Sequence, residues 1–427
     1  MEASNNTIAK SRWYRLLPIA FITYSLAYLD RANFGFGAAS GMAKDLNITP
    51  AMSSLLGSLF FLGYFFFQVP GAVYAEKRSA KKLIFWSLIL WGGLAMATGI
   101  ISNVNALIVI RFTLGVVESA VMPAMLLFLS RWFTKAERSQ ANTFLILGNP
   151  ATILWMSVLS GYLIEAVGWR WMFILEGLPA VIWAFFWWRL VDDKPEDANW
   201  LSHSEKQALL NRLHQEQQGI KPVKNYAEAF KSRVVILLSL QYALWSIGVY
   251  GFVMWLPSIL NAAPNMTIVK TGWLSSVPYV LAIIGMLGAS YYSDKTLNRK
   301  AFVWPFLVLG AIAFYGSYLV GVSNFWLSFM LLILAGGAMY APYGPFFAII
   351  PEILPRNVAG GAMALINSFG ALGSFIGSYI VGYLNGTTGS FGASYLFMAG
   401  SLFLSAVITL IAVKKPEHAP EVVPQVS

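Results

Sequence analysis

Four charged side chains stand inside long apolar stretches of the sequence, where charge is costly. Asp30 and Arg31 are neighbours in the first stretch, and Arg111 and Glu118 lie in the fourth. An ionisable side chain at the centre of a membrane helix costs about 2.5–3.5 kcal/mol on insertion scales, so a charge that persists there marks a functional site or an ion pair. These four residues are the first candidates for chemistry.

The four charges divide into fixed cations and groups that can exchange protons. A guanidinium presents a planar fork of donors to a carboxylate, so Arg31 is predicted to bind an organic anion. Asp30 and Glu118 can switch between charged and neutral forms, and Arg111 is predicted to keep one of them ionised. The set favours proton-coupled movement of a small organic anion. The alternative is that the four charges form two ion pairs that only join the two helices.

Helical spacing puts these groups on defined faces. Arg111, Gly115 and Glu118 are separated by four and then three residues, which places them on one face two turns long. Tyr28 and Arg31 share a face of the first helix in the same way. Asp30, the next residue to Arg31, is expected to point about 100° away from it.

The second half of the chain offers a neutral wall instead of charges. Asn367 lies within its fifth apolar stretch, and Tyr343 and Phe347 follow helical spacing within its fourth. Asn149 is the matching amide of the first half, and a mid-span amide needs a partner. These four residues are predicted to contact substrate, whereas Glu176 is assigned to helix packing.

Twelve apolar stretches must position these residues. Of the 427 residues 57% are hydrophobic and only 11% charged, with a mean hydropathy of +0.63, whereas a soluble protein is about a quarter charged. This excludes a Rossmann enzyme, a solenoid and a disordered scaffold, and predicts an all-α integral membrane protein with twelve transmembrane helices. The stretches fall at about 16–36, 51–75, 83–102, 106–130, 141–166, 171–190, 234–260, 271–292, 302–321, 326–350, 359–384 and 392–413.

The longest polar segment divides the chain into two sets of six helices. The expected organisation is an N-terminal half over 1–190, a linker over 191–233 that lies on one membrane face, a C-terminal half over 234–413 and a tail over 414–427. A shift of 218 residues superposes Asn149 on Asn367 and also aligns the loop residues given next. Glu76 and Lys77 fall on Asp294 and Lys295, and Arg138 falls on Arg356. Four coincidences at one offset favour two pseudo-symmetric halves with a site between them.

The basic residues predict the orientation. Loops on the side of both termini and the linker hold 23 Lys and Arg, and the opposite loops hold three. By the positive-inside rule both termini are cytoplasmic, and the net charge of +10 is a topology signal rather than a nucleic-acid footprint. The polar start carries no cleavage signal, so the first stretch is expected to be a retained helix of a multi-pass protein.

Metal and cofactor chemistry is not expected. The chain has no cysteine and three histidines, which fall in the linker and tail. No nucleophile motif or phosphate loop is present, so an enzyme is the least favoured class. Protons are the expected coupling ion, and the partners are a small anion and the lipid bilayer, with a monomer expected.

Several motifs resemble the major facilitator superfamily, specifically its anion:cation symporter branch, over about 12–414. They are YLDRAN at 28–33, QVPG at 68–71, RFTLGVVE at 111–118, GWRWMF at 168–173 and EGLP at 176–179. The loop after the second span is similar to the superfamily's gate motif, with Glu76 for the usual aspartate and Ala72 and Ser79 for glycines. The stretches 21–28 and 339–347 look most like bacterial 2-ketogluconate permeases.

The resemblance implies roles for individual residues. In such symporters an arginine of the first span holds the substrate carboxylate, which here is Arg31, and Asp30 and Glu118 carry protons. Tyr28, Tyr64, Asn149 and Asn367 match polar positions around the sugar hydroxyls, and Phe347 matches an aromatic position.

The implied function is proton-coupled import of 2-keto-D-gluconate by alternating access across a bacterial cytoplasmic membrane. Glu76 and Asp294 with Arg138 and Arg356 are expected to latch the cytoplasmic side, beside Lys77. The alternatives are another hexonate or hexuronate, such as gluconate, galactonate or glucuronate, or a drug or metabolite efflux antiporter.

Overall fold

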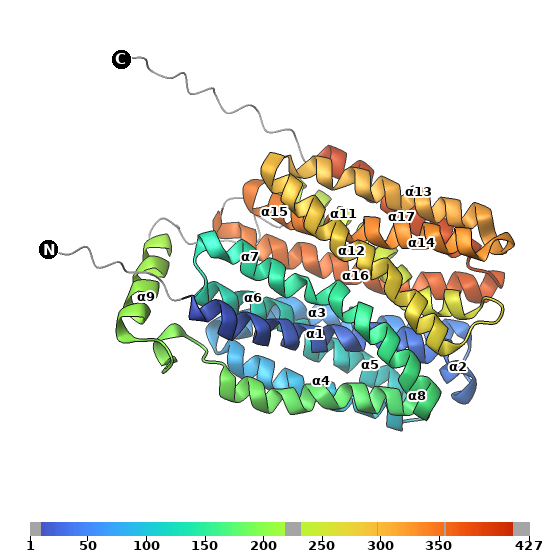
Figure 1. Cartoon of the computed structure of the whole chain (residues 1–427), viewed down its shortest axis with the longest axis horizontal. Coiled ribbons are helices and arrows are strands. Elements are labelled where there is room, and N and C mark those ends of the chain that lie inside the picture. Colours follow the sequence, from blue (N-terminus) through green and yellow to red (C-terminus); the bar gives the residue numbers. More distant parts are fainter. Residues whose placement is uncertain (1–9, 218–231, 297, 354–355, 413–427) are drawn as a thin grey trace, which may run out of the picture.

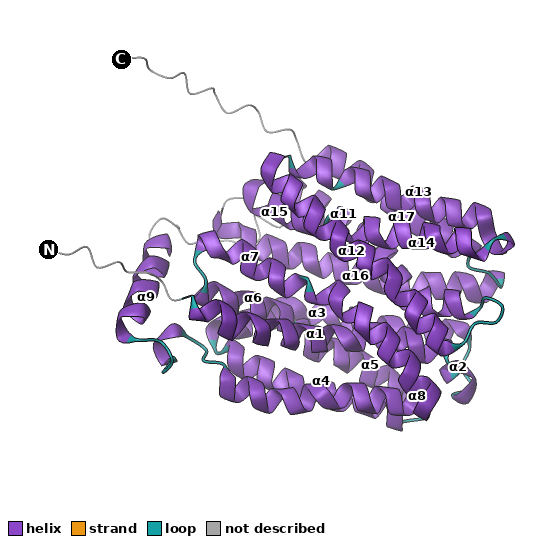
Figure 2. Ribbon diagram, viewed as in Figure 1, coloured by secondary structure: helices purple, strands orange, loops and turns teal. Residues whose placement is uncertain are grey.

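The protein is described from a computed structural model, over residues 10–217, 232–296, 298–353 and 356–412. Throughout these residues the regular structure is helical (Figure 2). The first part contains α1 (Ser11–Ala39), α2 (Met42–Asp45), α3 (Pro50–Lys77), α4 (Ala80–Ile100), α5 (Val104–Ser119), α6 (Val121–Trp132), α7 (Lys135–Ile146), α8 (Gly148–Leu190), η1 (Pro195–Asp197) and α9 (His203–Gln217). The second contains α11 (Arg233–Asn261), α12 (Ile268–Thr296), η2 (Arg299–Phe302), α13 (Trp304–Val320), η3 (Gly321–Ser323), α14 (Phe325–Tyr340), α15 (Tyr343–Ile353), α16 (Arg356–Thr388) and α17 (Gly392–Ala412).

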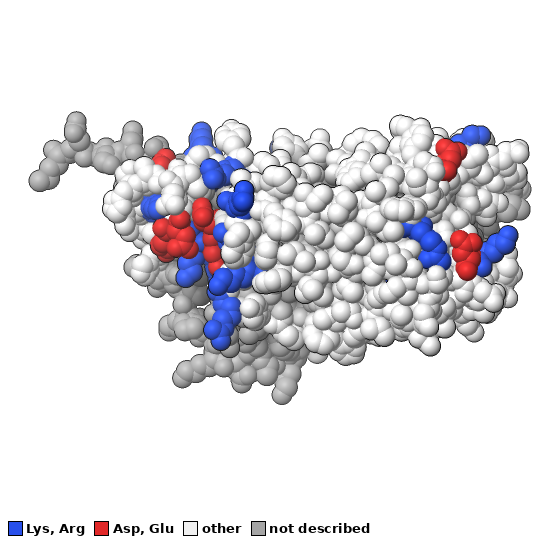
Figure 3. Space-filling model, turned by 90° about the horizontal axis from the view of Figure 1, so that it is seen from below, with Lys and Arg blue, Asp and Glu red and all other residues white. Residues whose placement is uncertain are grey.

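The chain is a multi-pass membrane protein. Ten helical segments of the described residues are long and apolar enough to cross a membrane. One of them, Phe144–Leu190, contains two predicted spans, so these segments account for eleven. The twelfth is the first predicted span, which lies in α1 with its charged residues Asp30 and Arg31. Figure 3 shows the charged side chains gathered at the two ends of one face, with an uncharged band between them. Such a band fits the hydrocarbon layer of a bilayer.

Local sequence explains where several helices begin. Thr49, Ser79 and Asn103 cap α3, α4 and α5, because each side chain accepts a hydrogen bond from a backbone N–H three residues later. The residue that follows Thr49 is Pro50, whose fixed φ suits the first helical position. These caps satisfy donors that a helix cannot satisfy by itself where it meets the interface.

Four predicted spans differ from the observed helices. The fifth and sixth join in α8, which bends at Gly168 with φ 81° and ψ 167°. That conformation is easy for glycine and strained for other residues, so the tight turn depends on this position. The fourth span divides into α5 and α6, and the tenth into α14 and α15. Hydropathy cannot detect these breaks because both sides of each are apolar.

The helices form two groups that follow the predicted pseudo-symmetry. In Figure 1 the helices up to α8 lie together, and α11 to α17 lie beside them. The offset of 218 residues relates the start of α3 at Pro50 to the start of α12 at Ile268. The groups meet where α1 packs on α11, α3 on α16 and α8 on α12. A site between the groups is thus bordered by helices from both.

The helix bundle has two charged ends (Figure 3). The end that carries Arg12, Lys81, Arg131 and Arg299 is called the basic end. At this end Arg12 of α1 donates to both Glu137, at 2.8 Å, and the carbonyl of Trp132. Partial burial acts to raise the pKa of Glu137, but hydrogen bonds from Thr134 and Arg12 outweigh it and leave the pKa lowered.

The described part of the linker docks at this basic end. Trp200 stacks on Trp132 at 5.4 Å between ring centroids, and Arg131 pairs with Asp193 at 3.3 Å. Helix α9 lies beside the start of α1 (Figure 1). The linker therefore covers the basic end of the N-terminal half.

The predicted latch lies outside the side chains that the structure describes. Only the backbones of Glu76, Lys77, Arg138, Asp294 and Arg356 are described, as parts of α3, α7, α12 and α16. The latch remains a prediction.

Candidate functional site

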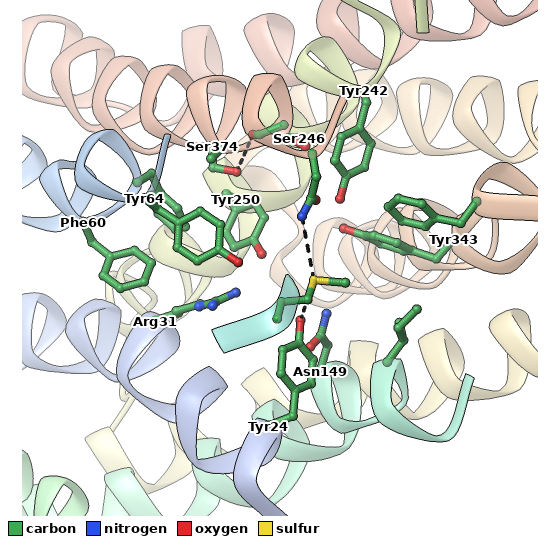
Figure 4. A pocket seen from close by; sticks show the side chains of 17 residues that line it. Tyr24, Arg31, Phe60, Tyr64, Asn149, Tyr242, Ser246, Tyr250, Tyr343 and Ser374 are labelled. Carbon is green, nitrogen blue, oxygen red and sulfur yellow. Dashed lines mark hydrogen bonds between the residues drawn. The ribbon is translucent and has the colours of Figure 1, made fainter. Parts of the chain in front are cut away.

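A cavity lies between the two halves at the middle of the bundle. The room it leaves for water-sized molecules is about 40 Å³, so the cavity is narrow in this conformation. Six of the predicted site residues line it: Arg31, Tyr64, Asn149, Tyr343, Phe347 and Asn367. Side chains from both halves project into it from opposite sides (Figure 4).

Arg31 is the one cation among the residues that line this cavity. Its guanidinium lies between 4.9 and 5.5 Å from the ring centres of Tyr28, Phe60 and Tyr64. Three rings at this distance favour the cation and hold its plane in place. The side chain is only 5% exposed, and Nη2 has no hydrogen-bond partner among the described residues. A buried guanidinium N–H without an acceptor fits a site that receives an anion.

Glu118 of α5 forms an ion pair with Arg31 on the Nε side of the guanidinium. The Nε of Arg31 donates to Oε2 of Glu118 at 3.3 Å, and Glu118 is fully buried. The second carboxylate oxygen, Oε1, has no partner among the described residues. Because this pair uses Nε, it leaves Nη2 of Arg31 without a partner among the described residues.

Arg111 lies deeper in the N-terminal half and does not line the cavity. Its Nε donates to the backbone carbonyl of Leu56 at 3.1 Å, and its guanidinium lies 4.6 Å from the ring centre of Phe34. The carboxylate of Glu118 is thus paired with Arg31 of α1, while Arg111 is anchored to α3. The alternative of two ion pairs is wrong for the described residues, because Arg31–Glu118 is the pair formed among the four charges.

Close helix packing positions these charges. A Cβ on Gly115 would lie 1.8 Å from the carbonyl oxygen of Phe60, so α5 can approach α3 this closely only with glycine there. Arg111 and Glu118 flank Gly115 on the same helix face. The glycine therefore brings both charges against α3 and α1.

Asp30 lies outside the cavity, with 2% of its surface exposed. It points away from Arg31, its neighbour in sequence, and accepts a hydrogen bond from Asn33 Nδ2 at 3.3 Å. Tyr28 also stands behind the lining, where its hydroxyl donates to that of Tyr250 at 3.2 Å. Through Tyr250 it joins the two halves across the middle of the protein.

The C-terminal half supplies an aromatic wall. Tyr343 and Phe347 stack at 6.3 Å between ring centroids, and Tyr242 lies 5.5 Å from Phe347. Behind them Trp245 is fully buried and donates to the carbonyl of Met339 at 2.9 Å. This wall carries hydroxyl groups and no charge among its described residues, in contrast with the opposite wall.

Sequence reasoning missed several lining residues, of which one pair had a usable signal. Tyr24 and Tyr242 are separated by 218 residues, as are Asn149 and Asn367, and all four line the cavity. The Tyr24 hydroxyl and the Asn367 amide both approach the sulfur of Met122, at 3.5 and 3.8 Å. The other missed residues are Phe60, Phe61, Met122, Ile146, Ser246, Tyr250, Gly370, Ala371 and Ser374. These are common residue types in membrane helices, and only the fold gathers them.

The two halves close tightly at the end opposite to the basic end. Asn261 Nδ2 donates to the carbonyl of Ala39 at 2.9 Å, which joins the ends of α11 and α1. Nearby, a Cβ on Gly35 would lie 2.4 Å from the carbonyl oxygen of Met254. A side-chain hydrogen bond and a close approach of the two backbones thus hold α1 against α11 at that end.

The described residues contain no group of three metal-ligating side chains. The chemistry of the site therefore rests on a cation, buried acids, hydroxyls and amides. Such a site can bind an anion with several hydroxyl groups and can exchange protons, but it offers no nucleophile arranged for covalent catalysis.

The fold and the site define a membrane carrier built from two related halves. The major facilitator superfamily family model matches residues 20–378 and 260–426, so the chain belongs to this superfamily. It is a transporter and not an enzyme.

Particular relatives extend over nearly the whole chain. A putative tartrate transporter of Agrobacterium vitis is 30% identical over 418 residues, covering 96% of each chain. A quinolone resistance transporter of Acinetobacter baumannii is 31% identical over 95% of this chain and 94% of its own length. A probable galactarate/D-glucarate transporter, GudP of Escherichia coli, is 26% identical over 94% and 93%.

Solved structures confirm the fold. The crystal structure of a D-xylose–proton symporter superposes with a TM-score of 0.76 at 14% sequence identity, covering 94% of this chain and 98% of the other. At this identity the likeness concerns the fold alone.

Proposed function

We propose that this protein imports a sugar-acid anion together with protons, with 2-keto-D-gluconate as the first substrate to test. The observation that carries the proposal is Arg31, a buried cation with an unpartnered Nη2 on a cavity whose other polar groups are hydroxyls and amides. A carboxylate suits the guanidinium, and the Tyr24–Tyr242 and Asn149–Asn367 pairs suit a chain of hydroxyls. Relatives named for tartrate and for galactarate and D-glucarate support this substrate class.

The ion pair suggests how protons and substrate are coupled. While Glu118 is ionised it competes with a substrate carboxylate for Arg31, because both are anions within reach of one guanidinium. A proton on Glu118 weakens that pair and frees Arg31 for substrate. Asp30 supplies the second proton-binding group. Binding and protonation therefore support each other.

Transport then follows alternating access across the bacterial cytoplasmic membrane, with both termini in the cytoplasm. The carrier loads protons and substrate from outside, turns about the central cavity and releases both inside. The contacts of Ala39 and Gly35 with α11 close the outer side. If more than one proton accompanies a monoanion, each turnover carries net positive charge inward, which gains about 2.3 kcal/mol per charge per 100 mV.

The decisive experiment is uptake of labelled 2-keto-D-gluconate into proteoliposomes. An inward proton gradient should drive uptake, and collapsing the gradient with a protonophore should end accumulation. Empty liposomes and the Arg31→Ala variant serve as controls. If the unmodified protein does not accumulate the compound, gluconate, galactonate, glucuronate and tartrate are tested next; failure with all of them refutes the sugar-acid proposal.

A second candidate, efflux of an aromatic drug, is favoured by the quinolone resistance relative and by the aromatic wall of the cavity. Expression in a drug-sensitive strain separates the two functions. Efflux predicts a raised inhibitory concentration of a quinolone without proton-driven uptake of any sugar acid.

A further inference from the structure

A third buried acid lies near the proposed coupling residues Asp30 and Glu118. Glu176, on the second arm of α8, is 3% exposed, and the hydroxyl of Ser160 donates to its Oε1 at 2.6 Å. Its Oε2 has no partner among the described residues, and none of the described ion pairs includes it. An ionised carboxylate buried with a single neutral donor is very unfavourable, so such a group neutralises instead.

An amide connects this acid to Asp30. Asn33 of α1 is fully buried, its Nδ2 donates to Asp30 Oδ1 at 3.3 Å, and its amide side chain also lies close to the carboxyl group of Glu176. The Oδ1 of Asn33 has no partner among the described residues. Two acceptor atoms, Asn33 Oδ1 and Glu176 Oε2, are thus left unpartnered in one buried cluster.

One proton completes this cluster. An amide offers donors at its nitrogen and an acceptor at its oxygen. The nitrogen suits an ionised carboxylate, whereas the oxygen can accept only from a carboxyl group that carries a proton. A proton on Glu176 Oε2 lets it donate to Asn33 Oδ1 and satisfies both unpartnered atoms. If the Asn33 amide is flipped, its nitrogen faces Glu176 and its oxygen faces Asp30. Asp30 is then the carboxyl group that must carry the proton.

We infer that Asp30, Asn33 and Glu176 form a one-proton site, in which a protonated Glu176 holds Asn33 so that Asn33 stabilises ionised Asp30. Glu176 is thus a positioning residue for proton coupling, beyond the roles of Asp30 and Glu118. The groups that face the site are Ser160 from the first arm of α8, and Glu118 and Arg111 from α5, which act on Asp30. The inference rests on the proposed function only for the role of Asp30 in coupling.

Infrared spectroscopy of the purified carrier tests the stored proton directly. The unmodified protein at neutral pH should show the carbonyl stretch of a protonated carboxyl, sensitive to exchange into D₂O. The Glu176→Gln variant should lose that part of the band, whereas Ser160→Ala should keep it. An unchanged band in Glu176→Gln overturns the inference, because Glu176 would then be ionised.

The pH dependence of substrate exchange tests the positioning role. In Glu176→Leu the Oδ1 of Asn33 has no donor, so Asn33 stabilises ionised Asp30 less well. The midpoint, the pH at which exchange is half-maximal, should then rise by about one unit, which is a tenfold change in the proton affinity of Asp30. In Glu176→Gln the new amide can still donate to Asn33, so the midpoint should stay within a few tenths of a unit. Equal midpoints in the leucine and glutamine variants contradict the positioning role.

The two measurements separate this inference from the proposed function. If no sugar acid is transported but the Glu176 band is present, the proposed substrate is wrong and the proton site stands. If transport is proton-driven but the band is insensitive to Glu176, the function stands and the site is refuted.

Discussion

Replacing Arg31 by alanine is expected to remove substrate binding and also to destabilise the protein, for two separable reasons. Binding is lost because the cavity then has no cation for the carboxylate among its described lining. Stability is lost because Glu118, which is fully buried, loses the Nε that lies 3.3 Å from its Oε2. Breaking a buried ion pair by removing one partner costs about 3–5 kcal/mol.

A second substitution separates the two effects. In the Arg31→Ala, Glu118→Gln double variant no buried charge is left unpaired, so most of the lost stability should return while binding remains absent. Arg31→Lys keeps the charge but has one compact ammonium for both Glu118 and the substrate. Loss of one charge-assisted hydrogen bond, about 1.5–3 kcal/mol, should weaken binding about 10- to 150-fold.

Stability is measured as the free energy of unfolding in mixed micelles, and binding by titration calorimetry with the transported sugar acid. Arg189, which ends α8 and lies outside the cavity, provides the matched control in Arg189→Ala. Unchanged binding in Arg31→Ala would refute the assigned role of Arg31. A double variant as unstable as Arg31→Ala alone would refute the argument from the unpaired charge.

The other predictions concern the cavity and the two ends of the bundle. Asn149→Ala and Asn367→Ala should each weaken binding about tenfold, the effect of one or two lost hydrogen bonds; calorimetry checks this, and unchanged affinity in both would exclude them from the site. Gly35→Ala adds a Cβ that would lie 2.4 Å from a backbone oxygen of α11, so the contact between α1 and α11 at the end opposite to the basic end should loosen, and a cysteine introduced at Ala39 should react faster with a membrane-impermeant maleimide. No increase would contradict this prediction. The pKa of Glu137 is lowered by folding, so its stabilisation is present above the usual value of 4.5 and is lost as the pH falls through the lower value. Glu137→Gln should therefore reduce the apparent melting temperature at neutral pH and make little difference at about pH 3; an equal reduction at both would count against the ionic contribution.

The cavity shows which site features the sequence could predict. Arg31, Asn149 and Asn367 stood out because a charge or amide within an apolar helix needs a partner. Tyr24 and Tyr242 could have been found by the same offset that relates the asparagines, but the chain has 19 tyrosines, so one aligned pair carries a weak signal. Ser246, Tyr250 and Ser374 had no distinguishing pattern.

The partners of the charges could not be predicted from spacing. Spacing correctly put Arg111 and Glu118 on one face of α5, yet Glu118 pairs with Arg31 of α1. The choice depends on how closely the helices approach, and Gly115 sets that approach through contact with the backbone of α3. Helical periodicity describes one helix and contains no distances between two.

The sequence by itself determined the membrane class, the twelve spans, the two related halves and the residues whose charge needed a reason. Hydropathy and period decide these because lipid requires every backbone group to be satisfied within a helix. The tertiary structure decided which atoms are left without partners. The open edge of Arg31 and the bridge from Asp30 through Asn33 to Glu176 exist only because α1, α5 and α8 bring together side chains that are far apart in the sequence, and buried polar groups depend on such neighbours for their hydrogen bonds.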